Sequence, residues 1–246
     1  MNKYNFIGKT ALITGANRGI GRAFVEVLAS LGVNTIYACA RNITDLAELT
    51  ENNPEVIKPI MLDVSNEEHV KLLVSKIDSL DILINNAGII NPSLCSSQDL
   101  ISIARHEMDV NYFAPLQITQ TLLPLLKKSN EAAIINISSI AAISSFPGIV
   151  SYSSTKAAIH SYTQGLRAEL TGDNIRVIGV YPGPVDTRMT EGWDVEKASP
   201  EQIATKTLNL LNTNLNSIFP DSFSEKMYSV FLDHPEKLEQ TFLEMM

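Results

Sequence analysis

The sequence is poor in cysteine and in basic residues, and each shortage excludes a class of protein. Cys39 and Cys95 are its only cysteines. They form neither a disulfide framework nor a metal-ligand spacing, so we predict no metal site and a reducing, cytoplasmic setting. Lysine and arginine number 19 against 27 aspartate and glutamate residues, which gives a net charge of −8 at pH 7. This acidic balance argues against nucleic acid or an anionic membrane surface as a partner, because both require a basic face.

Charged side chains are absent from Ala132 to Thr155, a stretch long enough to cross a lipid bilayer. It contains Asn136, Pro147 and Gly148 among many serines and threonines. We therefore interpret it as a buried strand followed by a polar loop rather than as a membrane span. The first residues of the chain have no long apolar segment and no cleavage-site pattern, so we expect no secretory signal.

Short apolar runs alternate with longer amphipathic segments, which indicates repeated strand–helix units and a parallel sheet. The runs are continuous rather than alternating because helices are expected to cover both faces of the sheet. We predict one domain over residues 1–246. The predicted strands are residues 10–14, 35–40, 57–62, 82–85, 133–138, 176–181 and 217–219. The predicted helices are residues 19–31, 45–51, 67–79, 99–128, 153–171 and 200–212, with a capping box of Ser65 and Glu68 at the third.

Three glycines, Gly15, Gly19 and Gly21, lie between the first predicted strand and the first predicted helix. A strand that turns directly into a helix leaves backbone N–H groups unpaired, and these groups together with the helix dipole attract a pyrophosphate. Glycine allows the phosphate and the backbone to approach closely. The bare pattern also fits a plain tight turn, but its place between a strand and an amphipathic helix favours a dinucleotide site.

Tyr152 and Lys156 are four residues apart in a predicted helix, and Ser139 precedes Tyr152 by thirteen residues. Residues four apart share a helix face, so the ammonium group is expected to lower the phenol pKa from about 10. Such a phenol can exchange a proton with a substrate oxygen near neutral pH. Ser139 can hydrogen-bond the same oxygen. As isolated residues, these side chains would more often be structural.

Taken together, residues 14–21, residues 85–88, Ser139, Tyr152, Lys156 and Pro182-Gly183 resemble the short-chain dehydrogenase/reductase family, over about residues 8–190. The resemblance is to the single-domain branch of about this length. It implies an α/β fold that is Rossmann-like and doubly wound, with a mainly seven-stranded parallel sheet and helices on both faces. It also implies hydride transfer between a nicotinamide cofactor and a small-molecule carbonyl or alcohol, in a homodimer or homotetramer.

The resemblance assigns a catalytic role to Ser139, Tyr152, Lys156 and Asn111. Asn111 is expected to kink its helix and to hold a water that relays protons to the lysine; alternatively it is a helix interruption without chemistry. Residues 182–187 are expected to close over the nicotinamide. The implied cofactor-binding residues are Gly15, Asn17, Arg18, Gly19, Ile20, Gly21, Arg41, Asp63, Val64, Asn86, Ala87, Gly88, Tyr152, Lys156, Pro182, Gly183, Val185 and Thr187.

Ala40 ends the second predicted strand, at the place where relatives that use NAD have an acidic residue, and Arg41 follows it. NADP needs a cation for its 2′-phosphate, and Arg18 in the glycine loop is expected on the same side. Both arginines also fit a solvated surface, but their convergence in so acidic a chain favours NADP(H) over NAD(H). Asp63 resembles the residue that bonds the adenine amino group, and its alternative role is a plain helix-start residue before Ser65.

The segment of residues 187–200 is expected to cover the substrate, and acidic residues within it argue against a carboxylate-bearing substrate. Residues 220–246 depart from the family pattern and end in a helix that Pro235 starts. The apolar residues of that helix are expected to cover either a neighbouring subunit or the site. The apolar residues expected in that helix are Phe242, Leu243, Met245 and Met246. On the substrate side, four residues imply an apolar or aromatic carbonyl compound: Phe146, Ile149, Met189 and Trp193.

The hypothesis that best joins these features is an NADPH-dependent reductase of aldehydes or ketones with Tyr152 as general acid and base. One alternative is an NAD-dependent alcohol dehydrogenase of the same family. Another is a non-catalytic NADP(H) sensor or scaffold, because a fold does not fix a function. The presence of Ser139, Tyr152 and Lys156 together argues against the sensor, since a binding protein does not need all three.

Overall fold

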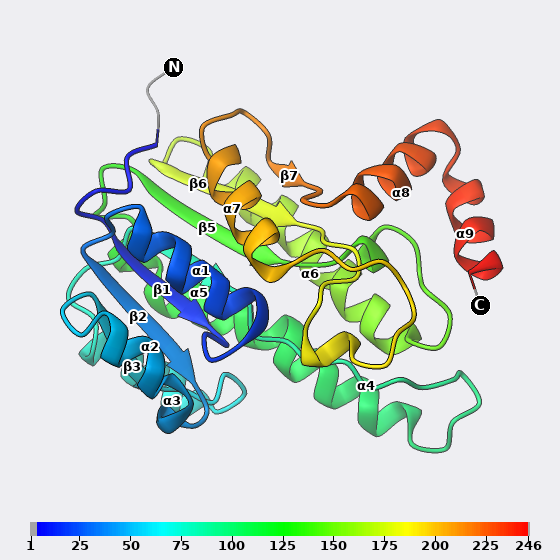
Figure 1. Cartoon of the computed structure of the whole chain (residues 1–246), viewed down its shortest axis with the longest axis horizontal. Helices are drawn as coiled ribbons and strands as arrows, with labels where there is room; N and C mark the ends of the chain where they lie inside the picture. Colours follow the sequence, from blue (N-terminus) through cyan, green and yellow to red (C-terminus); the bar gives the residue numbers. More distant parts are fainter. Residues whose placement is uncertain (1–3, 246) are drawn as a thin grey trace.

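A parallel sheet of seven strands in the order β3-β2-β1-β4-β5-β6-β7 forms the centre of the computed structural model, which describes residues 4–245 (Figure 1). The strand order reverses between β1 and β4, so the sheet is doubly wound, as predicted. Such a reversal opens a crevice at the carboxyl ends of the strands. The strands are β1 Thr10–Thr14, β2 Thr35–Ala40, β3 Ile57–Met61, β4 Ile82–Asn85, β5 Ala132–Ile137, β6 Ile175–Val180 and β7 Ser217–Ile218.

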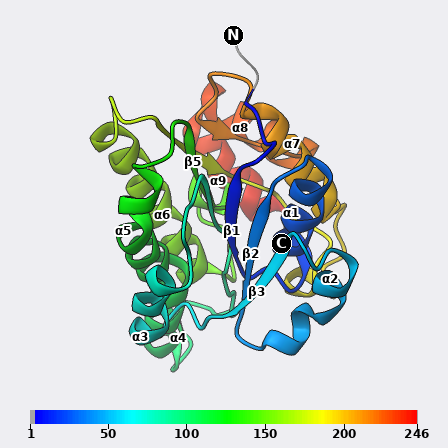
Figure 2. The same cartoon turned by 90° about the vertical axis from the view of Figure 1, so that its left-hand side faces the viewer.

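Helices cover both faces of the sheet, and Figure 2 shows the two layers on either side of the strands. One layer contains α1, α2 and α7, and the other contains α3, α4, α5 and α6. Because helices cover both faces, the central strands are continuously apolar, whereas the edge strand β3 exposes Lys58 and Met61. The helices are α1 Gly19–Ser30, α2 Ala47–Asn52, α3 Glu67–Lys71, α4 Leu100–Met108, α5 Ala114–Leu126, α6 Val150–Glu169, α7 Pro200–Leu210, α8 Ser222–Asp233 and α9 Pro235–Glu244.

Each strand sends alternate side chains into two separate cores. In β1, Ala11 and Ile13 pack on the side of Phe24 from α1, whereas Leu12 packs on the side of Leu122 from α5. All five of these side chains are fully buried. The sheet is therefore held from both sides, and its carboxyl edge is a rigid platform.

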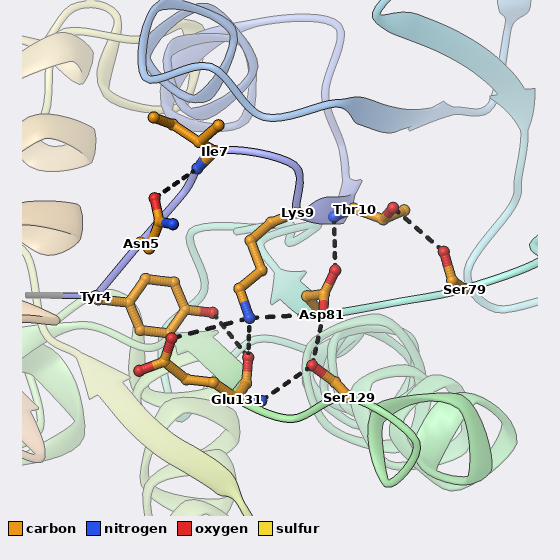
Figure 3. A network of polar contacts seen from close by, with 9 residues as sticks. All are labelled: Tyr4, Asn5, Ile7, Lys9, Thr10, Ser79, Asp81, Ser129 and Glu131. Carbon is orange, nitrogen blue, oxygen red and sulfur yellow. Dashed lines mark hydrogen bonds and ion pairs between the residues drawn. The ribbon is translucent and has the colours of Figure 1, made fainter.

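Polar contacts join the opposite, amino edge of the sheet (Figure 3). Asp81, just before β4, accepts a hydrogen bond from the Thr10 amide at 2.8 Å, and its carboxylate lies 3.7 Å from the Lys9 ammonium. Lys9 also donates to the Glu131 carbonyl at 2.7 Å, just before β5. This network ties together the starts of the three central strands.

Two predicted helices are interrupted in the structure. The predicted helix over residues 99–128 is divided into α4 and α5 by a π-helical turn at Asp109–Phe113. The predicted helix over residues 67–79 ends as α helix at Lys71 and continues as a 3₁₀ turn over Leu72–Ser75. The capping box of Ser65 and Glu68 is wrong. Asn66 caps α3 by accepting from two backbone amides, while Ser65 bonds back to Asp63.

The end of the chain forms two further helices at the β7 end of the sheet (Figure 1). Pro235 begins α9 as predicted, but α8 was not predicted. Asp221 and Ser224 form a capping box at the start of α8. Phe242 of α9 is fully buried, whereas Leu243 is exposed, and Met246 lies outside the described residues. Within residues 4–245, no helix has the length and apolar character that a membrane crossing requires.

Candidate active site

A cavity of about 870 Å³ lies at the carboxyl edge of the sheet, over the reversal between β1 and β4. It brings together residues from across the chain, including Gly15, Asp63, Asn86, Tyr152 and Thr187. Every predicted site residue lines this cavity except Gly21 and Asn111. A volume at the upper end of the range for ligand pockets suits a long ligand.

The glycine loop has the backbone that the sequence pattern requires. Gly15 and Gly19 have φ values of +65° and +53°, a region that favours glycine. A Cβ on Gly21 would lie 2.2 Å from the Gly15 carbonyl oxygen, so Gly21 lies behind the loop and allows α1 to pack against it. No side chain caps the start of α1. Its first N–H groups can therefore bind a phosphate, and the loop fits a dinucleotide.

The loop after β4 is fastened to the glycine loop by Thr14. The Thr14 hydroxyl accepts from the amides of Asn86 and Ala87 at 2.9 and 3.0 Å. The side-chain amide of Asn86 donates to the Thr14 carbonyl at 2.9 Å. These bonds fix the distance between two walls of the cavity.

The stretch after β6 forms another wall and lies against the glycine loop. A Cβ on Gly19 would be 3.0 Å from the Thr187 methyl group, so the two segments touch. On the other side, the Gly183 amide donates to the Asp221 carboxylate at 2.9 Å. Asp221 also caps α8, so α8 is anchored directly to this wall.

Arg18 follows β1 and Arg41 follows the neighbouring strand β2, and both side chains are exposed and line the cavity. Neither forms an ion pair with any residue in the described part of the chain. Asp63 also lines this part of the cavity, and hydrogen bonds from Ser65 hold the pKa of its carboxyl below the usual range. The charged side chains that line this part of the cavity are therefore Arg18, Arg41, Asp45 and Asp63.

Tyr152 and Lys156 lie together on α6, with the lysine nitrogen 5.5 Å from the centre of the tyrosine ring. Both side chains are buried. Burial raises the pKa of Tyr152 to about 12, although a hydrogen bond with Ser139 acts to lower it. Burial also lowers the pKa of Lys156 to about 8. The expectation of a lowered tyrosine pKa is wrong here, because desolvation of the buried phenolate outweighs the lowering effect of Ser139.

Ser139 and Ser138 are adjacent but have different surroundings. The Ser138 hydroxyl is buried and donates to the Lys156 carbonyl at 3.1 Å. The Ser139 hydroxyl accepts from the Ala141 amide at 3.2 Å and donates to the Pro182 carbonyl at 3.5 Å, and it lies close enough to Tyr152 to act on the pKa of the phenol. Both serines line the cavity, but only Ser139 acts on the pKa of Tyr152, and Ser139 is the serine that the thirteen-residue interval favours.

Asn111 lies in the π-helical turn between α4 and α5, where the predicted kink occurs. Its side chain accepts from the Ile89 amide at 2.9 Å and donates to the Ile89 carbonyl at 2.9 Å. It also donates to Thr155 at 3.0 Å. π-Helical turns recur at functional sites, and this one joins the loop after β4 to α6.

Apolar side chains surround the tyrosine end of the cavity, among them the four predicted from the sequence. The predicted acidic residues Glu191, Asp194 and Glu196 do not line it. A hydrogen bond joins the two ends of the covering segment, residues 187–200: the Asp186 amide donates to the Ala198 carbonyl at 2.9 Å. The apolar lining residues include Ile90, Ile140, Phe146, Ile149, Met189, Trp193, Val195, Phe223 and Met245.

Comparison with known proteins identifies the group to which this site belongs. The sequence model for short chain dehydrogenase matches residues 9–198. The chain belongs to the short-chain dehydrogenase family. As a member of that family it is an NAD(P)-dependent dehydrogenase/reductase, and it acts on a small-molecule substrate.

Relatives of this short-chain dehydrogenase include an uncharacterized oxidoreductase of Staphylococcus saprophyticus, 33% identical over 85% of this chain and 95% of that protein. The 3-oxoacyl-(acyl-carrier-protein) reductase FabG of Thermotoga maritima is 34% identical over 75% of this chain and 77% of its own length. A short chain dehydrogenase from Burkholderia cenocepacia, solved in complex with NADP, is 32% identical with a TM-score of 0.91. That match covers 98% of this chain and 99% of that chain.

Some lining residues of this dehydrogenase escaped the sequence interpretation. His106 on α4, Arg188 in the covering segment and Phe223 on α8 all line the cavity. Phe223 could have been found, because Asp221 and Ser224 carry the spacing of a helix cap. Nothing in the sequence alone distinguishes His106 or Arg188 from surface residues. No cluster of metal-ligating side chains occurs among residues 4–245.

Proposed function

We propose that this chain is an NADPH-dependent carbonyl reductase in which Tyr152 gives a proton to the oxygen of an aldehyde or ketone. The observation that carries the proposal is a single cavity with Arg18 and Arg41 at one end and Tyr152 at the other. A dinucleotide laid along it would have its adenosine at the arginines and its nicotinamide near the tyrosine.

The preference for NADPH is supported by the two unpaired arginines. Guanidinium groups form strong, charge-assisted hydrogen bonds with phosphate oxygens. No acidic residue occupies the end of β2, where Ala40 is followed by Arg41. When bound, the cofactor would supply the hydride, and the first N–H groups of α1 would hold its pyrophosphate.

The protonation of Tyr152 suits it to the role of proton donor in carbonyl reduction. With a pKa of about 12 the side chain is a neutral phenol at neutral pH, so it can donate to a carbonyl oxygen. Ser139 would hydrogen-bond the same oxygen and polarise the carbonyl. Lys156, with a pKa of about 8, holds a proton at neutral pH and can return one to the tyrosine. Asn111 would position the loop after β4 beside this group.

The substrate class is inferred from the walls around Tyr152. Phe146, Met189, Trp193 and Phe223 offer apolar surface and no acceptor or donor of their own apart from the indole N–H. A carbonyl compound with an apolar body fits such walls, because burying a charged group there would carry a desolvation penalty.

The cofactor preference is tested by titrating the protein with NADPH and NADH. Replacing Arg41 with alanine should weaken NADPH about 10- to 150-fold, equivalent to about 1.5–3 kcal/mol for a charge-assisted contact, and NADH much less. Arg105→Ala is the matched control, because Arg105 is exposed on α4 and does not line the cavity. Tighter binding of NADH than NADPH by the unmodified protein would contradict the proposal and favour the NAD-dependent alternative.

Turnover is tested separately from binding. NADPH oxidation should follow the addition of at least one member of a panel of apolar aldehydes, ketones and diketones. Tight NADPH binding without turnover on any of them would favour the sensor or scaffold alternative. Assembly into dimers or tetramers and a cytoplasmic location stay predictions from the sequence.

A further inference from the structure

The start of α8 is fastened to the stretch after β6 by one buried carboxylate. Asp221 is only 2% exposed. Its Oδ2 accepts from the Gly183 amide at 2.9 Å and from the Ser224 hydroxyl at 2.9 Å, and its Oδ1 accepts from the Ser224 amide at 2.8 Å. The bonds from Ser224 cap α8. The bond from Gly183 serves another purpose, because Gly183 belongs to the cavity wall and not to the helix.

The peptide unit between Pro182 and Gly183 connects this carboxylate with the serine of the site. Its N–H donates to Asp221. Its C=O accepts from the Ile140 amide at 3.0 Å and from the Ser139 hydroxyl at 3.5 Å. A peptide unit is planar and rigid, so holding both of its ends fixes the position of α8 relative to the loop that carries Ser139.

Phe223, the second residue of α8, is the side chain that this arrangement directs into the cavity wall. A Cβ on Gly183 would lie 2.7 Å from the Phe223 ring, so the ring packs directly against the bare backbone of Gly183. Phe223 and Phe146 both pack against the apolar cluster that includes Ile140. Phe146 also packs against the cluster that contains Tyr152. The Phe223 ring therefore fills the space between Gly183 and the apolar surroundings of the tyrosine.

We propose that Phe223 is a specificity-determining residue whose ring limits the size of the carbonyl substituent that fits beside Tyr152, and that Asp221 is the residue that positions this ring. The inference rests on the proposed function, because it takes carbonyl compounds as the substrates. A substrate group as large as a phenyl ring would compete with Phe223 for the space next to Gly183. Removing the Phe223 ring should therefore make room for an aryl group on the ligand.

The first test combines a smaller side chain with a larger ligand. Acetophenone and benzophenone are ketones that differ by the replacement of a methyl group with a phenyl ring. In Phe223→Ala, the ratio of kcat/KM for benzophenone to kcat/KM for acetophenone should rise at least about tenfold, the change expected when a buried site accepts one more aromatic ring. An unchanged ratio would overturn the proposal. Phe223→Leu should raise the ratio by less, and it decides the question if the alanine variant does not fold.

Phe231→Ala is the matched control. Phe231 is also a partly buried phenylalanine of α8, but it does not line the cavity. Its loss loosens the packing of the same helix without opening the site, so the ratio should stay within about twofold of that in the unmodified protein. An equal rise in Phe231→Ala would contradict the proposal, because general loosening of α8 would then explain the change in selectivity.

The role of Asp221 is tested with Asp221→Asn. Asparagine is as good a helix cap as aspartate, but its side chain has one acceptor oxygen instead of two. The cap at Ser224 can therefore remain while the bond from the Gly183 amide is lost. Hydrogen exchange at the Gly183 amide should become at least about tenfold faster, and the ratio for the two ketones should rise as it does in Phe223→Ala. An unchanged ratio would overturn the positioning role.

The double variant separates positioning from a merely structural effect. If Asp221 acts through the Phe223 ring, adding Asp221→Asn to Phe223→Ala should change the ratio for the two ketones no further than Phe223→Ala alone. Additive effects of the two substitutions on the ratio would contradict the positioning role, because Asp221 would then act on selectivity without the ring.

Binding decides the inference without turnover. Calorimetric titration of each ketone into the complex with NADP⁺ gives the ratio of the two Kd values, which should shift toward benzophenone in Phe223→Ala and stay unchanged in Phe231→Ala. Failure of Phe223→Ala to bind benzophenone more tightly than the unmodified protein does would overturn the proposal. If no carbonyl compound is reduced, the proposed function fails, while these Kd values still support or overturn the role of Phe223.

Discussion

Replacing Gly21 with alanine tests whether the glycine loop requires the start of α1 to pack directly against the backbone of Gly15. The added Cβ would lie 2.2 Å from the Gly15 carbonyl oxygen and 2.5 Å from the Asn86 side-chain nitrogen. Neither neighbour can simply move away, because the first is backbone and the second is bonded to the Thr14 carbonyl at 2.9 Å. The start of α1 must therefore shift away from β1, and the loop after β4 must loosen.

Overpacking of this kind costs about 2 kcal/mol, which corresponds to a fall in Tm of about 4–8 °C for a domain of this size. NADPH affinity should fall at least about tenfold, because the N–H groups that face the phosphate move with the loop. Thermal unfolding and fluorescence titration with NADPH measure the two effects.

Gly165→Ala is the control for the Gly21 substitution. Gly165 is exposed in α6, and no atom lies within 4 Å of an added Cβ. Alanine there should leave NADPH binding unchanged and raise stability by up to about 1 kcal/mol, because it favours the helix. Normal Tm and normal NADPH affinity in Gly21→Ala would refute the reasoning about the loop.

Two further predictions concern buried side chains. Lys156→Met should abolish turnover yet raise the free energy of unfolding at pH 7. The lysine pKa falls on folding from 10.5 to about 8. Burial of the charged lysine therefore destabilises the folded state by about 3 kcal/mol below pH 8, and this destabilisation vanishes as the pH rises toward 10.5. The net gain in the free energy of unfolding is smaller than this, because the Ile137 carbonyl loses its hydrogen-bond donor in the variant. A gain in stability that grew with pH would contradict the prediction. Phe242→Ala should lower the free energy of unfolding in urea by about 3–5 kcal/mol. It should also raise KM for the carbonyl substrate without changing NADPH affinity, because the ring centres of Phe242 and Phe146 lie 5.1 Å apart. Alanine at the exposed Leu243 is the control.

The strands and the cofactor end of the site were predictable because their signals are local. Continuous apolar runs gave β1, β2 and β4 with their observed bounds, since strands buried on both faces need no polar alternation. The glycine loop was predictable because the backbone at Gly15 and Gly19 has positive φ angles. Such angles favour glycine, so the conformation of the loop is visible in the sequence as glycine residues.

The protonation state of Tyr152 and Lys156 was not predictable in the same way. The spacing of Tyr152 and Lys156 correctly placed them on one face of α6, but the shift in tyrosine pKa depends on burial by segments distant in the sequence. The burial of Glu107 on α4 was not predictable for the same reason. A glutamate in an amphipathic helix usually faces water, and only the fold reveals that this one does not.

The central claim is that Tyr152 is the proton donor in NADPH-dependent carbonyl reduction, and Tyr152→Phe tests it most directly. The variant keeps the ring that fills the pocket and removes only the hydroxyl group. We predict that kcat for reduction falls at least about 100-fold while the Kd for NADPH changes less than about twofold. Reduction at nearly the original rate in Tyr152→Phe would contradict the account.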